Sequence, residues 1–359
     1  MKHFWIFILL VFSFYVSLSQ IPTGYYDSAD GLTGEQLRSE LHEIIKNPQV
    51  TSYSGLWTAF QSTDKKPNGK VWDMYSDIPD GTPAYEYSFG SDQCGSYSAE
   101  GQCYNREHSV PASWFNDASP MYSDLFHLYP TDGYVNNRRS NYPFGKVASP
   151  TWTSTNGSKL GSSAVPGYTG TVFEPIDAYK GDFARTYFYM VTCYMDKVQN
   201  WSSPMFSGNN LSSWAINMLL QWHEADPVSE KEINRNNAVY QIQHNRNPYI
   251  DNPEWVLAVW DSNYEPSKLS NRSLTYFSVY PNPFSNNIKV NSLETLETIK
   301  ISKLEILNIS GQCLKSVAIS DFSRGINIET NELPEGFYIL RIKSEYFEQN
   351  FRIVKVSPN

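Results

Sequence analysis

Residues 94–115 read C-G-S-Y-S-A-E-G-Q-C-Y-N-R-E-H-S-V-P-A-S-W-F, and residues 124–144 read D-L-F-H-L-Y-P-T-D-G-Y-V-N-N-R-R-S-N-Y-P-F. These two segments hold the acid–base and ligand candidates that matter most in the chain. Carboxylate and amide oxygens are the ligands that Mg²⁺ and Ca²⁺ prefer. Arginine forks match phosphate oxygens, and a neighbouring histidine can take a proton near neutral pH. The composition therefore indicates a site for a hard cation and a phosphate.

The local pattern predicts two strands and a helix around these residues. A first strand over 104–108 has to stop before Pro111, and a second over 125–128 is expected to end at Pro130. Thr131 or Asp132 can then cap a helix that runs to about Arg139. Adjacent strand residues point to opposite faces, so Glu107 and His108 reach one site only if the backbone is irregular there.

Two motifs in this region resemble the bacterial endonuclease I family. They are R-E-H-S-V-P at 106–111 and, after it, D-L-x-H-L-x-P-x-x-x-x-V-N-x-x-R at 124–139. A third stretch, Q-H-N-R-N-P-Y-I-D-N-P at 243–253, is also similar, and the resemblance covers roughly residues 35 to 260. One departure is Phe126, where many relatives carry histidine. Members of the family are secreted or periplasmic nucleases with a ββα-metal active site, which needs the order strand, strand, helix.

The resemblance implies a fold and a catalytic centre. The expected class is α+β, with a ββα-metal core embedded in a mostly helical domain over residues 20–265. His108 is the expected general base, and Glu107 and Asn136 are the expected ligands of Mg²⁺, with Ca²⁺ or Mn²⁺ as alternatives. Asn137 is the rival of Asn136, and only the family's V-N placement favours Asn136.

Further residues are expected to support the substrate and the site. Arg139 is expected to steady the phosphate, because it shares a helix face with Asn136 at spacing i, i+3. Arg138 and Arg246 are candidates for substrate binding. The alternative for Arg138 is a place on a solvated helix face, and the alternative for Arg246 is a structural polar network. Asp124 and His127 flank the second strand. His127 either orients a ligand from behind or is a packed core histidine.

Composition and charge restrict the function. The chain has 359 residues, which suggests about two domains, and 40% of them are hydrophobic. The net charge is −9, whereas a protein that coats nucleic acid usually presents a broad basic face. An enzyme needs only a local positive patch, supplemented by a divalent cation. The acidic total therefore favours a nuclease site over tight non-specific binding.

The N-terminus predicts export. Lys2, an apolar run from Phe4 to Val16 and small residues at 17–19 are typical of a signal peptide over residues 1–19. The alternative is a membrane anchor, but the apolar run is short for a span. We therefore expect a secreted or cell-surface protein that passes through the periplasm. In that oxidising location Cys94 and Cys103 are expected to form a disulfide; free thiols or half of a zinc site are the alternatives.

The middle of the chain holds further strand and loop signals. Residues 71–75 and 85–89 read as strands, and residues 148–171, rich in Ser, Thr, Gly and Pro, predict a long surface loop. Capping boxes are expected at Thr33 and Ser229, and Asp182 is expected to cap a buried helix.

In residues 275–359 the pattern changes to short segments of alternating hydrophobicity separated by turns, which predicts the strands of a small β-sandwich. V-Y-P-N-P-F at 279–284 and G-F-Y at 336–338 resemble the C-terminal sorting domain of type IX secretion substrates. That resemblance implies recognition by the type IX secretion machinery. The alternative is an ordinary carbohydrate- or protein-binding sandwich.

The resulting hypothesis is a secreted, metal-dependent, non-specific endonuclease that acts on DNA, with RNA as a further substrate. We expect a monomer without a membrane span. Two alternatives come from other classes: a secreted nucleic-acid- or surface-binding protein without turnover, and a phosphodiesterase acting on other substrates. A zinc hydrolase is disfavoured because the chain contains no H-E-x-x-H.

Overall fold

The computed structural model describes residues 21–79, 81–262, 264, 277–292, 301–308, 311–319, 325–344 and 348–357. Contacts divide the chain into two compact units, residues 1–263 and 264–359. The expected signal peptide at residues 1–19 lies outside the described residues. No helix within the described ranges is both long and apolar enough to cross a membrane.

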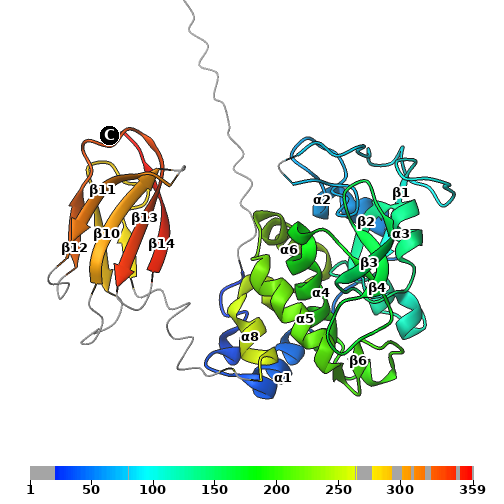
Figure 1. Cartoon of the computed structure of the whole chain (residues 1–359). Helices are drawn as coiled ribbons and strands as arrows, with labels where there is room; N and C mark the ends of the chain where they lie inside the picture. The colour runs from blue at the N-terminus through cyan, green and yellow to red at the C-terminus, as the bar shows by residue number, and fades with distance from the viewer. Residues whose placement is uncertain are drawn as a thin grey trace, which may run out of the picture. The chain divides into compact units, whose positions relative to one another are not determined.

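The order strand, strand, helix is present in the first unit (Figure 1). Strand β1 (Tyr104–His108) pairs antiparallel with β2 (Leu128–Asp132), so that Glu107 lies opposite Tyr129. Helix α3 (Gly133–Arg139) follows β2 directly. The Asp132 side chain accepts a hydrogen bond of 2.8 Å from the backbone N–H of Val135, which caps the helix as expected.

The second strand begins later than predicted. Residues 125–127 form a turn in which the Asp124 carboxylate accepts a hydrogen bond from the N–H of Phe126 at 2.9 Å. Strand β2 then continues through Pro130, which lies opposite Arg106. In a two-stranded sheet each strand has an unpaired edge, so a proline without an N–H donor is tolerated there. The prediction that Pro130 ends the strand was therefore wrong.

Helices form most of the rest of this unit. They are α1 (Gly34–Ile45), α2 (Leu56–Thr63), α4 (Lys180–Cys193), α5 (Ser213–Ala225), α6 (Glu230–Gln243), α7 (Pro248–Asp251) and α8 (Glu254–Trp260). Short 3₁₀ helices lie at Asp27–Ala29, Ala112–Phe115, Met121–Ser123, Asp177–Tyr179 and Val198–Asn200. Helix α4 is buried from Gly181 to Cys193, as its apolar pattern predicted. The fold class α+β is confirmed.

The helix starts agree only partly with the sequence. Ser229 and Glu232 form the expected capping box at α6, whereas the Thr33 side chain makes no capping hydrogen bond at α1. Asp182 does not cap α4. It lies inside the first turn, where its carboxylate accepts from Lys231 Nζ at 2.6 Å. A buried lysine needs such a partner, and Asp182 supplies it from the first turn of α4.

Residues 148–171 were expected to form a surface loop, but they contribute to a three-stranded antiparallel sheet. Its order is β3 (Val147–Thr153), β4 (Lys159–Ser163) and β5 (Thr171–Glu174). A further pair is formed by β6 (Phe206–Ser207) and β7 (Asn210–Leu211). Residues 71–75 and 85–89, expected to be strands, are turns and extended segments; Val71 makes only an isolated bridge to Lys65.

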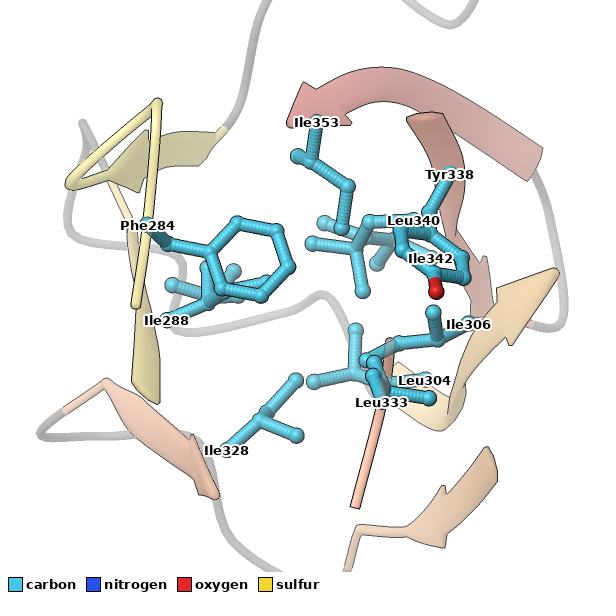
Figure 2. Packing of buried hydrophobic residues seen from close by; sticks show 11 residues of the cluster. Phe284, Ile288, Leu304, Ile306, Ile328, Leu333, Tyr338, Leu340, Ile342 and Ile353 are labelled. Carbon is cyan, nitrogen blue, oxygen red and sulfur yellow. The ribbon is translucent and has the colours of Figure 1, made fainter. Parts of the chain in front are cut away.

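The C-terminal unit is a sandwich of two antiparallel sheets. One has the order β11 (Cys313–Ala318), β10 (Ile301–Asn308), β13 (Gly336–Ser344), β14 (Glu348–Lys355). The other has the order β12 (Ile326–Glu329), β9 (Asn287–Ser292), β8 (Phe277–Tyr280). Ile288 and Ile328 from the smaller sheet pack with Leu340, Ile342 and Ile353 from the larger one (Figure 2). The predicted sandwich is thus present, with β12 as an additional strand.

Candidate active site

An open cavity of about 340 Å³ lies where the end of β1 meets α3. Glu107 and His108 from β1, and Asn136 and Arg139 from α3, line it together. Strand alternation would place Glu107 and His108 on opposite faces. The pairing of β1 with β2 stays in regular register as far as His108, the last residue of β1, and the consecutive residues Arg106, Glu107 and His108 all line the cavity.

Glu107 is buried, with 2% of its surface exposed. Its Oε1 atom accepts hydrogen bonds from Tyr75 Oη at 2.8 Å and from Arg139 Nη1 at 2.9 Å. Burial raises the pKa of Glu107 to about 7, although Arg139 and the Tyr75 hydroxyl act in the opposite direction. Both hydrogen bonds use the same oxygen, so Oε2 is the carboxylate atom that the described residues leave available for a ligand.

Asn136 is half-buried and faces the same cavity. Its Nδ2 donates a hydrogen bond of 2.7 Å to Asn105 Oδ1, and no described residue donates a hydrogen bond to its side-chain oxygen, which remains an available acceptor. Asn137 is exposed and does not line the cavity. This placement favours Asn136 over Asn137 as a ligand.

These two residues fit a hard cation. A carboxylate and an amide oxygen offer the donor set that Mg²⁺ takes, and Mg²⁺ keeps several water molecules when it binds. No cluster of three or more His, Cys, Asp or Glu side chains occurs among residues that the structure describes. Glu107 and Asn136 would therefore hold the ion with water and substrate oxygens completing its shell.

His108 has a defined tautomer in its neutral state. Its Nε2 atom lies 3.0 Å from the carbonyl oxygen of Tyr122, which can only accept a hydrogen bond. Nε2 therefore carries the proton, and Nδ1 is the basic atom. Burial lowers the pKa of His108 to about 3, with His127 contributing in the same direction. The imidazole is thus neutral at pH 7, and a phosphate anion in the cavity would raise its pKa.

The His108 ring packs against the aromatic rings of Tyr122 and Tyr53. The ring centroids of His108 and Tyr122 lie 5.2 Å apart in a stacked arrangement, and Tyr53 stacks at 5.8 Å. His127 is fully buried, with its ring centroid 5.4 Å from that of His108 and its Nε2 atom 2.7 Å from the Met121 carbonyl oxygen. These contacts favour the prediction that His127 is a packed core histidine. Its ring packs beside that of His108 and makes no described contact with Glu107.

Arg139 is buried, with 1% of its surface exposed. Its Nη1 atom donates to Glu107 Oε1 and, at 2.8 Å, to the backbone oxygen of His108, while Nη2 donates to the backbone oxygen of Ser109. Although Arg139 lines the cavity, three of its four terminal N–H groups already donate to protein oxygens, and its Nε atom, which has no hydrogen-bond partner in the described part of the chain, is buried. The geometry favours positioning of β1 over direct contact with a phosphate.

The remaining predicted residues lie away from the catalytic centre. Arg138 is exposed and lies two positions from Asn136, about 200° around α3, with its guanidinium over the Tyr134 and Trp152 rings. Arg246 is buried against Asp251, to which its Nε donates at 2.6 Å. The expectation that Arg246 lines the same cleft is therefore not met, because its fork is paired elsewhere.

Asp124 is a structural carboxylate. It is fully buried, and Oδ2 accepts from Tyr189 at 2.8 Å and from Tyr194 at 2.6 Å. Gln243 donates to Oδ1 at 3.0 Å. These bonds anchor the turn before β2 to α4 and to the end of α6, and burial raises the pKa of Asp124. Asp124 therefore acts on the site only through the position of this turn.

Several cavity residues were missed by sequence reasoning. Ser113, Ser140 and Asn141 line it with neutral donors, and Tyr75 contacts Glu107 from a distant segment. Ser140 and Asn141 directly follow the predicted helix, so their position was a usable signal. Nothing in the local sequence indicates that Tyr75 reaches Glu107, because 32 residues separate them.

The Cys94–Cys103 disulfide is present, with the two Cα atoms 5.6 Å apart. Cys103 directly precedes β1, and its carbonyl oxygen accepts from the N–H of Gly133 at the start of α3 at 3.0 Å. The disulfide thus restricts the segment that precedes β1, and this segment is hydrogen-bonded to the start of α3. Cys193 is a buried free thiol.

Comparisons with known proteins identify the families that the two parts of the chain match. Residues 33–254 match the family Endonuclease I, and residues 278–356 match the secretion system C-terminal sorting domain. The extracellular ribonuclease of Bacillus subtilis is 32% identical over 252 residues, which are 66% of this chain and 78% of the relative. The extracellular ribonuclease of Bacillus amyloliquefaciens is 34% identical over the same shares.

A shorter match is to endonuclease-1 of Buchnera aphidicola subsp. Baizongia pistaciae. It is 30% identical over 128 residues, which are 36% of this chain and 46% of that protein. Together with the extracellular relatives and the sorting domain, these findings indicate a secreted nuclease. The chain belongs to the endonuclease I family and is an endonuclease that carries a secretion system C-terminal sorting domain.

Proposed function

We propose that this endonuclease hydrolyses phosphodiester bonds with His108 as the general base and a divalent cation held by Glu107 and Asn136. The observation that carries the proposal is the cavity in which these three side chains meet. Mg²⁺ is the proposed ion, with Mn²⁺ and Ca²⁺ as alternatives, because both donors are oxygen atoms.

His108 performs the proton transfer in this proposal. Nδ1 takes a proton from the attacking water, while the remaining oxygen adds to phosphorus. The bond between phosphorus and the 3′ oxygen then breaks, which leaves a 5′-phosphate and a 3′-hydroxyl after protonation by solvent. The Tyr122 carbonyl keeps the imidazole in the tautomer that this step requires. The bound cation supplies charge stabilisation for the leaving oxygen and for the pentavalent phosphorus.

Both DNA and RNA are proposed substrates. The relatives carry the names ribonuclease and endonuclease-1, and the two polymers share the bond that is cleaved. For delivery, we propose that residues 1–19 are a signal peptide, that residues 20–265 form the catalytic domain, and that residues 275–359 are recognised by type IX secretion machinery. The match to the sorting family supports this last step.

The proposed site is tested with two adjacent asparagine variants. The full chain is incubated with supercoiled plasmid or RNA in Mg²⁺, with and without chelator, beside Asn136→Ala and Asn137→Ala. We expect cleavage to require the metal, and Asn136→Ala to need at least about tenfold more Mg²⁺ for half-maximal rate. Asn137→Ala should resemble the wild type because Asn137 lies outside the cavity.

The opposite results would assign the chain differently. If the wild type leaves DNA and RNA intact with Mg²⁺, Mn²⁺ and Ca²⁺, the proposed activity is wrong. Retained nucleic-acid binding would then favour a binding protein. Turnover of a small chromogenic phosphodiester alone would favour a phosphodiesterase with other substrates.

A further inference from the structure

A phosphodiester enters the cavity as an anion, so the cavity needs a cation with unused hydrogen-bond donors. Arg139 does not meet this need, because Glu107 neutralises it, both of its terminal nitrogens donate to protein oxygens, and its unpaired Nε atom is buried. Arg138 lies on the outer part of α3, and Arg246 is paired with Asp251. The arginines that the sequence analysis proposed for phosphate binding therefore do not offer a free cation in the cavity.

Arg106 is the other guanidinium that lines this cavity. It precedes Glu107 on β1 and is half-buried. Its guanidinium carbon lies 3.7 Å from the ring centroid of Tyr53 and 4.4 Å from that of Trp57. Stacking between two rings restricts the side chain before any ligand arrives, which reduces the entropy that binding would cost.

The donors of Arg106 are only partly used. Its Nη1 atom donates to the Tyr53 carbonyl oxygen at 2.7 Å. The Tyr53 hydroxyl is a further polar partner, and no carboxylate in the described ranges forms an ion pair with Arg106. Desolvation by two rings without a counter-ion leaves its positive charge available to an incoming anion.

We propose that Arg106 binds a non-bridging oxygen of the substrate phosphodiester, and that Tyr53 and Trp57 hold its guanidinium ready to do so. The inference rests on the proposed function and assigns the substrate-phosphate contact within that same cavity. Arg139 acts differently in this arrangement, because it positions Glu107 and the end of β1.

The salt dependence of cleavage separates a phosphate contact from a structural contribution. For the full chain, kcat/KM on a single-stranded oligonucleotide is measured between 50 and 200 mM NaCl, a range of about fourfold in salt. Arg106→Ala should lower kcat/KM by about 10- to 100-fold, as expected for loss of a charge-assisted hydrogen bond. It should also reduce the slope of log kcat/KM against log[NaCl] by about 0.7, the value for one phosphate contact.

Two further variants refine the assignment. Arg106→Lys keeps the charge but loses the planar fork, so the salt slope should stay near the wild-type value while kcat/KM falls. Trp57→Leu removes one stacking ring without a contact to His108, and it should raise KM with little change in kcat. Lys197→Ala is the matched control, since it removes an exposed charge that is paired with Asp196.

The outcomes are distinguishable. If Arg106→Ala and Arg106→Lys both keep the wild-type kcat/KM and slope, the inference is wrong while the nuclease proposal stands. A slope that changes in Arg138→Ala and not in Arg106→Ala would assign the phosphate contact to Arg138 instead. If the wild type and Lys197→Ala do not cleave at all, both the proposed function and this inference are overturned.

Discussion

Ser140 stands directly after α3 with φ 52° and ψ −132°, a backbone conformation that favours glycine. For a residue with a side chain, this backbone conformation costs about 1–3 kcal/mol of conformational free energy, and such residues often occur at functional sites. The exposed Ser140 side chain lines the catalytic cavity.

Replacement of this residue should therefore stabilise the protein. We expect Ser140→Gly to raise the free energy of unfolding by about 1 kcal/mol, measured by urea denaturation, because glycine adopts this conformation without a Cβ clash. Ser140→Ala keeps the Cβ atom and should bring no such gain. A Ser140→Gly variant that is less stable than wild type would show that the turn is not strained.

His127 should contribute to the pH dependence of stability. Burial lowers its folded-state pKa to about 4, whereas an unfolded histidine titrates near 6.5. Below pH 6.5 the unfolded state therefore binds more protons, so stability is fully present above that pH and is lost as the pH falls toward 4. The contribution of this one residue is about 3 kcal/mol when complete.

The measurement is the free energy of unfolding at pH 7 and pH 4 for wild type and His127→Gln. We expect the loss between the two pH values to be smaller in the variant, because His127 no longer titrates and no longer lowers the pKa of His108. His244→Asn, at an exposed histidine, serves as the control and should leave the loss unchanged. An identical loss in His127→Gln would mean that His127 is not held neutral by the fold.

At the scale of elements, Arg139 joins α3 to β1 through Glu107 and two backbone carbonyl groups. Removing one partner of a buried ion pair leaves an uncompensated charge, which costs about 3–5 kcal/mol. We expect Arg139→Leu to lose stability of that size in urea denaturation. The double variant Arg139→Leu/Glu107→Gln should recover part of it, and a single variant as stable as wild type would contradict this account.

The same elements show what the sequence could predict. Strand β1, helix α3 and the Asp132 cap were predictable because turn, capping and periodicity signals are local. Strands β3 and β4 were missed, since their Ser, Thr and Gly content resembles that of a loop. Helical spacing placed Arg139 on the face of Asn136, but the partners of its guanidinium depend on how β1 packs, which no local pattern contains.

At the scale of the whole molecule, the two units have separate cores. Leu340 is fully buried in the sandwich, whereas Leu219 is fully buried in the nuclease unit. We expect Leu340→Ala to lower the stability of the sandwich by about 2–5 kcal/mol and to leave kcat/KM for plasmid cleavage unchanged. Leu219→Ala is the matched change and should destabilise the nuclease unit instead. Thermal unfolding with parallel activity assays distinguishes the two.

A common loss of activity would contradict that independence. If Leu340→Ala reduced cleavage as strongly as Leu219→Ala, the sandwich would be needed for the fold of the nuclease unit. The alternating strands of the C-terminal unit need a core of their own, and the cluster around Leu340 provides it.

The most direct test of the central claim is cleavage by His108→Ala with and without added imidazole. If Nδ1 of His108 takes the proton from water, the variant should lose about 10²–10⁴-fold in kcat with Mg²⁺ present. Added imidazole should restore part of that rate in a saturable manner, because it can occupy the space of the missing ring. A His108→Ala variant that cuts plasmid within a few-fold of the wild-type rate would contradict the assignment of His108 as the base.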